Sequence, residues 1–101
     1  MATYFMLGKY SSDSIKEISA DRTDKTIRLI REIGGEVKKM YTLLGEYDAV
    51  LIVELPSIET AMKASLALNI LTGISFKTFP AVHVDDFDKM LEGPSKPSKR
   101  K

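Results

Sequence analysis

The sequence contains no cysteine and only one histidine among its 101 residues. Without cysteine there is no disulfide framework, no thiolate-bound zinc or iron–sulfur cluster, and no cysteine nucleophile. These absences exclude much of redox and cofactor chemistry, and we expect no cofactor.

Long apolar stretches are also missing. The longest runs from Ala49 to Val53 and ends at Glu54, far short of the roughly 20 residues that span a bilayer. Met1 is followed at once by a strand-like segment at 3–7, without the basic segment and apolar core of a secretory signal. The sequence therefore predicts a cytoplasmic protein with no membrane partner.

The net charge of +1 hides an excess of positive charge at the C-terminal end. Four basic residues and no acidic residue follow Gly93, so the rest of the chain has 11 basic and 14 acidic side chains. We predict one domain over 1–92, because a chain of this length supports one core, and a disordered basic tail over 93–101. Four charges without interleaved aromatic residues indicate no specific nucleic-acid partner.

Hydrophobic periodicity and turn residues divide the domain into strands and helices. The predicted elements are a strand at 3–10, a kinked or two-part helix from Ser11 to Gly34, a strand at 36–44, a strand at 47–55, a helix from Ser57 to Gly73, a strand at 74–84 and a short helix from Asp85 to Gly93. The strand at 47–55 is apolar on both faces, which is typical of a central strand. Lys38, Lys39 and Pro80 mark the strands at 36–44 and 74–84 as edge strands.

This order of elements predicts an α+β fold of the ferredoxin-like βαββαβ type, a four-stranded antiparallel sheet with both helices on one face. The other face should carry an apolar surface that includes Tyr4, Met6, Val50, Ile52 and Phe76. Such a patch is too large for a soluble monomer to expose to water, so we expect a second copy to cover it. The protein should then be a homodimer or a larger homo-oligomer.

Helix and strand spacing also predicts which side chains point inward. On the helix that starts at Ser57, the predicted buried side consists of Ile58, Ala61, Met62, Ser65, Leu66 and Ile70. In the strand at 36–44 one face should carry Val37, Tyr41 and Leu43, and in the last helix Phe87, Met90 and Leu91 should turn inward.

Several short segments occur in an order and spacing shared with a known family. They are Gly45-Glu46-Tyr47-Asp48, Leu7-Gly8-Lys9-Tyr10-Ser11, Arg22, Gly34-Gly35, Val53-Glu54-Leu55-Pro56 and Asp85-Asp86-Phe87. In these segments, over residues 3–91, the chain resembles the GYD-domain family of dimeric α+β barrel proteins. The resemblance implies a ferredoxin-like fold that pairs with a copy of itself.

The resemblance implies no activity, because the wider barrel group contains monooxygenases, isomerases and decarboxylating enzymes beside proteins with no known reaction. The chain departs from the family's pattern at Phe79-Pro80, where such proteins often carry a basic residue before Ala81. An anion contact at that position is therefore not implied.

Tyrosines and carboxylates near the Gly45 turn are the first candidate site residues. Tyr10, Tyr41 and Tyr47 are candidates to line a small-molecule cavity, with Arg22 and Asp48 as further ligand-binding residues; alternatively, the tyrosines are interface aromatics. Asp48 shares a strand face with Glu54 and is a candidate for acid–base catalysis. We favour the alternative that Asp48 accepts backbone hydrogen bonds at the hairpin and that Glu54 pairs with a basic residue.

His83 is the second catalytic candidate, because histidine is the side chain best suited to move protons near neutral pH. Its position at the end of an edge strand, beside Asp85 and Asp86, favours an exposed residue without that role. Three ligands within four positions seldom converge on one ion, so we predict no metal site from these residues.

The sequence leaves three classes of function open. The first is a homodimeric protein that binds a small, mostly apolar molecule in the cleft between its sheet and helices or within the barrel. The second is a cofactor-independent enzyme of the same barrel type, a monooxygenase or isomerase in which Asp48 or His83 moves a proton of a small cyclic or carbonyl substrate. The third is an assembly protein. The lack of a second histidine and of a carboxylate pair at catalytic spacing favours binding.

Overall fold

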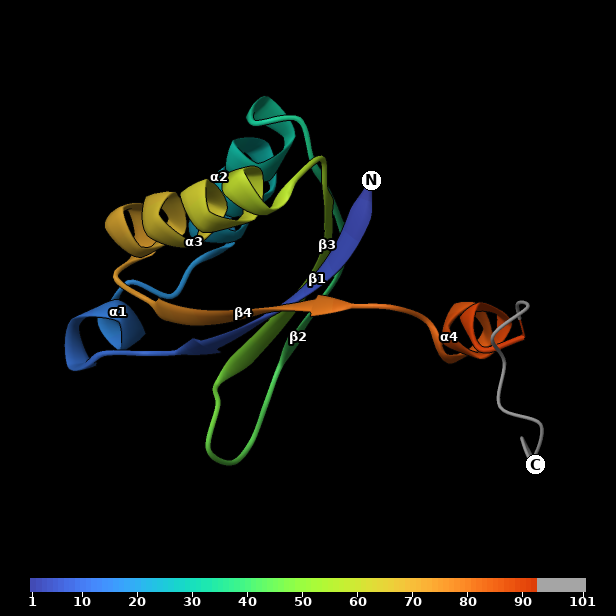
Figure 1. The fold of residues 1–101 in the computed structure, drawn as a ribbon. Helices are drawn as coiled ribbons and strands as arrows, with labels where there is room; N and C mark the ends of the chain where they lie inside the picture. The colour runs from blue at the N-terminus through green and yellow to red at the C-terminus, as the bar shows by residue number, and fades with distance from the viewer. Residues whose placement is uncertain (93–101) are drawn as a thin grey trace.

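Figure 1 presents the computed structural model of the chain, which describes residues 1–92. Its elements are β1 (Ala2–Lys9), α1 (Ser12–Lys16), α2 (Ala20–Glu32), β2 (Glu36–Thr42), β3 (Ala49–Leu55), α3 (Ile58–Thr72), β4 (Ser75–Ala81) and α4 (Val84–Met90). Among these residues no helix has both the length and the hydrophobicity needed to cross a membrane. The predicted tail at 93–101 lies outside the described residues.

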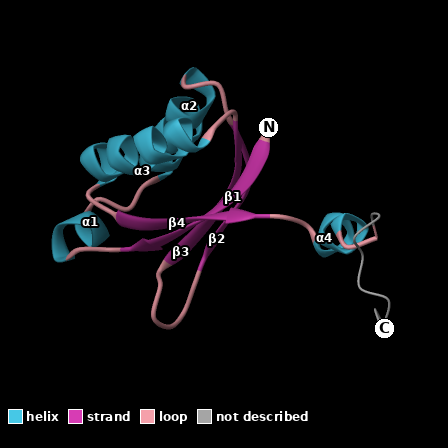
Figure 2. Ribbon diagram, viewed as in Figure 1, coloured by secondary structure: helices cyan, strands magenta, loops and turns pink. Residues whose placement is uncertain are grey.

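The four strands form one antiparallel sheet in the order β2-β3-β1-β4. As the sequence predicted, β3 lies inside the sheet and β2 and β4 at its edges. Pro80 is accommodated because an edge strand can include a residue without an N–H group. Helices α2 and α3 lie over one face of the sheet (Figure 2). This arrangement confirms the α+β, ferredoxin-like βαββαβ fold.

The hydrophobic core lies between the sheet and helices α2 and α3. Tyr4 pairs with Val53 and Met6 with Leu51, and all four side chains are buried on this side with Ile30 of α2. We call this side of the sheet the covered face. Burial of each large apolar side chain contributes about 1.5–3 kcal/mol, so this layer supplies much of the driving force for folding.

The opposite side of the sheet has no helix over it among residues 1–92, and we call it the open face. The strand registers place on it Thr3, Phe5, Leu7, Lys39, Tyr41, Val50, Ile52, Glu54, Lys77, Phe79 and Ala81. The prediction for this face was therefore right for Val50 and Ile52 and wrong for Tyr4, Met6 and Phe76. Because β1 is apolar on both sides, its alternation did not show which side the helices cover.

The predicted two-part helix is confirmed as α1 and α2. Ser11 and Ser14 form a reciprocal cap at the start of α1, with N···O distances of 3.0 and 2.6 Å. Ser19 restarts the helix by accepting a hydrogen bond from the backbone N of Arg22 at 3.1 Å. Each serine caps the start of one helix, Ser11 that of α1 and Ser19 that of α2, so the segment forms two helices instead of one.

Helix α3 packs on the sheet through small side chains. Its buried residues are Ala61, Ala64, Leu68 and Thr72. The prediction of a buried side was right for Ala61 and wrong for the large residues Ile58, Met62, Leu66 and Ile70, which are exposed. Alanines at the contact let the helix approach the strands closely, and the large residues then project on the outer side.

Strand β2 contains an irregularity that the sequence did not reveal. Its register shifts between Val37 and Lys39, so Val37 lies opposite Val53 and Tyr41 opposite Val50. Val37 thus faces the helices and Tyr41 belongs to the open face. The prediction that both share a face with Leu43 is wrong, because one extra residue reverses the alternation.

Helix α4 projects from the end of β4, away from the rest of the described chain (Figure 1). His83 caps its start, two residues before the predicted start at Asp85. The helix has no buried residue, and Phe87 and Met90 are exposed, so the prediction that they turn inward is wrong. Periodicity correctly predicted an amphipathic helix, but it gave no information on whether the same chain covers its apolar side.

Candidate functional site

Asp48 ties the chain together where β1 leaves the sheet. Its Oδ2 accepts a hydrogen bond from the backbone N of Tyr10 at 2.8 Å. Its own backbone N donates to the carbonyl of Gly8, and its carbonyl accepts from the N of Leu43, both at 2.8 Å. Asp48 therefore holds the 43–48 loop against the end of β1, which is a structural task for this carboxylate.

Arg22 lies beside Tyr10 on the helix side of the fold. Its guanidinium is 5.4 Å from the centre of the Tyr10 ring, and its Nη1 donates to the carbonyl of Ser14 at 2.6 Å. The cation and the ring face form a cation–π contact. Both residues line a hollow of about 120 Å³ between α2 and the sheet, with Thr26 and Met40 among the other walls. The structure thus brings Tyr10, Arg22 and Asp48 together.

Tyr41 and Tyr47 lie apart from that hollow. Tyr41 is half exposed on the open face. Tyr47 has the ammonium of Lys77, an open-face residue, 6.0 Å from its ring centre. The five residues predicted to bind a ligand therefore do not line one common cavity.

His83 lies at the other end of the sheet. Its Nδ1 accepts a hydrogen bond from the backbone N of Asp85 at 3.0 Å and lies 3.7 Å from the Asp85 carboxylate. Asp48 comes directly before Ala49, which pairs with Gly8, whereas His83 comes two residues after Ala81, which pairs with Thr3. At about 3.3 Å per strand residue, the five steps of β1 between these pairs separate the two candidates by more than roughly 15 Å. Within residues 1–92 no three His, Cys, Asp or Glu side chains form a cluster suited to a metal ion.

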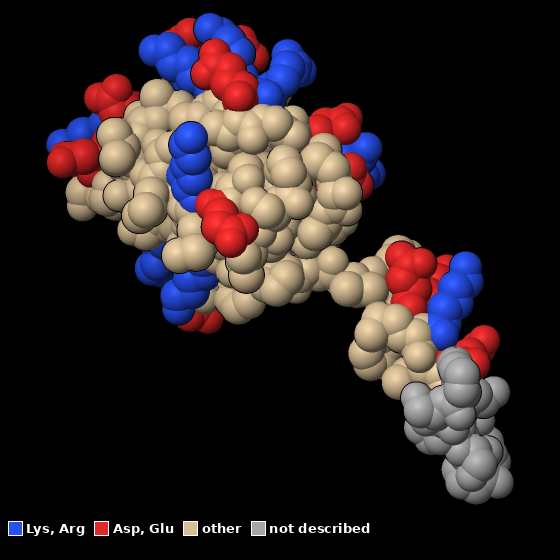
Figure 3. Space-filling view, turned by 45° about the horizontal axis from the view of Figure 1, so that its top comes forward, with Lys and Arg blue, Asp and Glu red and all other residues tan. Residues whose placement is uncertain are grey.

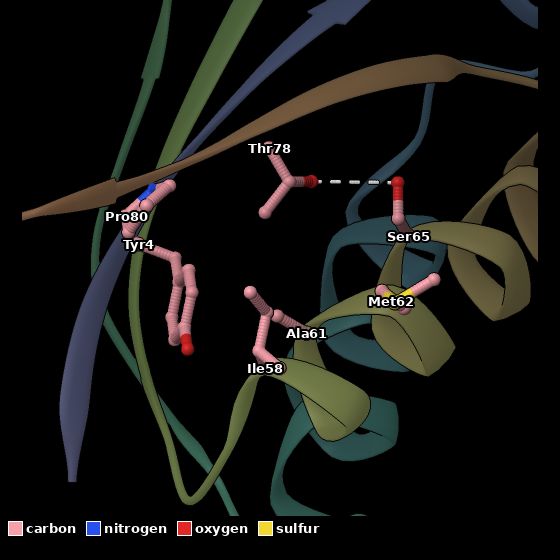
Figure 4. Close-up of a pocket in the computed structure, with 7 residues that line it drawn as sticks. All are labelled: Tyr4, Ile58, Ala61, Met62, Ser65, Thr78 and Pro80. Atoms are coloured by element: carbon pink, nitrogen blue, oxygen red, sulfur yellow. Dashed lines mark hydrogen bonds between the residues drawn. The ribbon is translucent and has the colours of Figure 1, made fainter.

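The structure has a larger cleft between α3 and β4 (Figure 4), and none of the residues that line it was among the predicted site residues. It has a volume of about 320 Å³ and is lined by Tyr4, Ile58, Ala61, Met62, Ser65, Thr78 and Pro80. No charged side chain lines it. Its polar side-chain groups are the hydroxyls of Tyr4, Ser65 and Thr78. In Figure 4 the Tyr4 ring lies on one side of the cleft and the Thr78–Ser65 pair on the other.

The hydroxyls of Ser65 and Thr78 make only long hydrogen bonds within the chain. Thr78 Oγ1 lies 3.4 Å from Ser65 Oγ, which in turn lies 3.4 Å from the Phe76 carbonyl. These distances are long for hydrogen bonds between hydroxyls and oxygen acceptors, so both groups retain capacity for a ligand. The signal in the sequence was one serine and one threonine at otherwise apolar positions of a helix and a strand. It could not be recognised without knowing that α3 packs against β4.

A second groove of about 420 Å³ lies on the open face. It is lined by Thr3, Phe5, Ile52, Ala81, Val82, His83 and Val84, from the end of the sheet and the segment that leads into α4. Figure 3, in which the helix side of Figure 1 is turned forward, shows a broad uncharged surface on that side of the body, with charged side chains around it and some near its centre. On α4 in the same view, charged and uncharged side chains occupy different sides.

Comparison with known proteins gives a family and a set of similar folds. The family model of the GYD domain matches residues 4–91, which is most of the chain. No curated protein matches the chain. The leucine response regulatory protein of Mycobacterium tuberculosis has a TM-score of 0.60 at 14% identity, over 82% of this chain and 51% of that protein.

An AsnC family transcriptional regulator from Agrobacterium tumefaciens has a TM-score of 0.55 at 19% identity, over 81% of this chain and 50% of its own. The chain spans about half the length of these regulators. At such identities the similarity concerns the fold alone.

Proposed function

The chain belongs to the GYD-domain family, and we propose that it works in the cytoplasm as a homodimer that binds a small, mostly apolar molecule. The observation that carries the binding proposal is the uncharged cleft between α3 and β4. The open face of the sheet supports the dimer.

Dimerisation is supported by the hydrophobic residues of the open face. Phe5 on β1 is 38% exposed and Phe79 on the neighbouring strand β4 is 48% exposed, and Tyr41 on β2, beyond β3, is 50% exposed. Contiguous apolar patches of this kind on soluble proteins commonly mark contacts with another molecule. A second copy offers the same surface, and a two-fold axis would cover both copies with one isologous contact.

The lining of the α3–β4 cleft suggests the class of ligand. Its volume lies at the lower end of the roughly 300–1,000 Å³ range of small-molecule sites, so it suits a compact molecule. Apolar walls favour an apolar body, and the hydroxyls of Tyr4, Ser65 and Thr78 offer hydrogen bonds to one or two polar atoms. A charged group would find no opposite charge there and would have to lose its water, which is costly.

One of the similar structures is named for a response to leucine, a small molecule with an apolar side chain. That name supports binding of a small molecule by this fold. Leucine itself suits the present cleft poorly, because its ammonium and carboxylate would both lack a charged partner among the lining residues. A neutral ligand is therefore part of the proposal.

Tyr10 and Arg22 are proposed as a second, minor contact site. Their hollow of about 120 Å³ is small, and Arg22 is the cation in its lining. Such a site suits a polar group of a few atoms. Asp48 would act there by positioning Tyr10, and Tyr41 and Tyr47 fit the dimer contact better than the cleft.

The enzyme alternative has less support. Asp48 and His83 each accept a backbone hydrogen bond, and they lie at opposite ends of the sheet. A proton-transfer site requires a group within hydrogen-bond reach of the substrate, and neither residue lines the α3–β4 cleft. No observation on the described residues favours catalysis over binding.

The first test is a native mass spectrum of the freshly purified full chain, which reports subunit number and any retained small molecule. We expect a dimer with added mass. The variant Ser65→Leu should lose that mass because leucine fills the cleft, and Thr78→Val should weaken its retention by removing a hydroxyl. Lys63→Leu, on the exposed side of α3, is the matched control and should keep the ligand.

A complementary NMR titration uses indole, a neutral, mostly apolar probe with one N–H donor. Shifts confined to Tyr4, Ser65, Thr78 and their neighbours would support the proposal. A dimer without added mass whose spectrum indole leaves unchanged would overturn the binding function. A chain that stays monomeric at micromolar concentration would overturn the dimer.

A further inference from the structure

The segment 82–92, called the arm below, is amphipathic and has no cover of its own. Within α4 and the turn that follows it, Val84, Phe87, Met90 and Leu91 recur at helical spacing, and the side chains of Val84, Phe87 and Met90 are 50–68% exposed. The intervening positions are largely charged, with Asp85, Asp86 and Lys89 among them. No strand or helix of residues 1–92 makes an extended packing contact with α4.

A helix this short needs a packing partner. α4 has seven residues, and isolated helices below about 12–15 residues are marginal in water because nucleation is costly. The His83 cap, and Asp85 and Asp86 in the first turn, help but contribute only on the order of 1 kcal/mol each. The apolar side of α4 must therefore be buried against something to hold the helix.

The open face supplies a surface of matching character. The groove at its end has Phe5 and Ile52 as its apolar floor, and its volume of about 420 Å³ exceeds that of the other hollows described above. Lys39 lies opposite Ile52 and Glu54 opposite Thr3 on the same face, so charges of both signs flank the groove, and its apolar floor is the feature that matches the arm. Within one chain the arm begins at this groove, where Val82, His83 and Val84 form part of the lining, and α4 then extends away from the sheet (Figure 1).

We propose that the arm of each copy lies on the open face of a second copy, with the apolar side of α4 in the partner's groove. The apolar side of α4 and the groove are both uncovered on one chain. In a two-fold dimer each α4 can contact the groove of the other copy, so the same contact occurs twice. The groove is then incomplete in a single chain and is closed by α4 of the partner. This inference rests on the dimer of the proposed function, but not on the α3–β4 ligand cleft.

The first experiment measures dimer dissociation of the full chain by sedimentation. Phe87→Ser should weaken the dimer about 10- to 100-fold, as expected for loss of a central aromatic anchor. Ile70→Ser is the matched control, because Ile70 is 85% exposed on the helix side of the molecule, and it should leave dissociation unchanged. If the wild type is a dimer and Phe87→Ser has the same dissociation constant, the proposed position of the arm is wrong, whereas the dimer itself is unaffected.

The second experiment locates the arm, and the absence of native cysteine makes it unambiguous. One population carries Thr3→Cys in the groove and another Met90→Cys on the arm; they are mixed and treated with a short bismaleimide. A covalent heterodimer is expected. The pair Ile70→Cys with Met90→Cys is the control and should give none.

A chain that carries both Thr3→Cys and Met90→Cys distinguishes the remaining outcomes. A crosslink only within single chains would mean that the arm folds back on its own sheet, and no crosslink at all would mean that it does not reach the groove. Either result overturns the proposal. A wild-type monomer would overturn it together with the dimer, whereas the native mass spectrum still tests the ligand cleft separately.

Discussion

The two faces of the sheet have similar apolar character but different surroundings. On the covered face Met6 and Val53 are fully buried beneath helices. On the open face their strand neighbours Phe5 and Ile52 remain partly exposed. The difference shows that hydrophobicity alone does not make a core, because the helices of one chain can cover only one side of its four-stranded sheet.

The largest effect is expected on the covered face. Met6→Ala should lower the free energy of unfolding by about 2–5 kcal/mol, since it leaves a cavity under the helices. Urea denaturation at one fixed protein concentration measures the loss. A change below about 1 kcal/mol would mean that the covered face is not the core of the fold.

The next effect concerns the end of the sheet where the chain turns toward the covered face. Asp48→Ala removes the acceptor of the Tyr10 N–H and should cost about 1–3 kcal/mol by the same measurement. Asp48→Asn keeps an acceptor oxygen and should lose less. Equal losses in both variants would show that the negative charge, and not the hydrogen bond, is what matters at this position.

A smaller effect should follow from weakening the cover itself. Ser57 caps α3 by accepting a hydrogen bond from the Thr60 N at 3.2 Å, so Ser57→Ala should cost about 1 kcal/mol. Ser75→Ala, an exposed strand position, is the matched control and should change stability by less than about 0.5 kcal/mol. If the control loses as much as Ser57→Ala, capping is not the cause.

The smallest effect on folding is expected on the open face. Phe79→Thr keeps a residue that favours strands and should change the unfolding free energy of the single chain by less than about 1 kcal/mol, yet weaken the dimer. Denaturation at high dilution and sedimentation together separate the two quantities. If Phe79→Thr lowers the unfolding free energy of the isolated chain by several kcal/mol, the open face contributes to folding as the covered face does.

Much of the fold could be predicted from the sequence, because local features fixed it. Serine caps, Gly34 and Gly73 with positive φ, and charged or proline-containing edge strands gave the element order and the strand positions in the sheet. Predictions about which side is buried were less successful. They were wrong for Tyr4 and Met6, where a strand apolar on both faces gives two equivalent readings, and for Tyr41, where the irregularity at Val37–Lys39 reverses the alternation.

The predicted ligand-binding residues stay predictions, although three of them lie together, since Tyr10 contacts Arg22 through its ring and Asp48 through its N–H. The residues that line the α3–β4 cleft were missed because its hydroxyls come from residues 4, 65 and 78, which only the packing of three elements brings together. The predicted catalytic roles of Asp48 and His83 stay predictions.

The sequence by itself determined the order of strands and helices, their caps and the GYD-family membership, because these depend on neighbouring residues and their spacing. Only the tertiary structure decided which sheet face is covered, which side of α3 is buried, and that α4 extends away from its own chain. Those outcomes depend on which apolar surfaces can reach one another in three dimensions. A chain with more apolar faces than it can pair internally leaves that choice to packing.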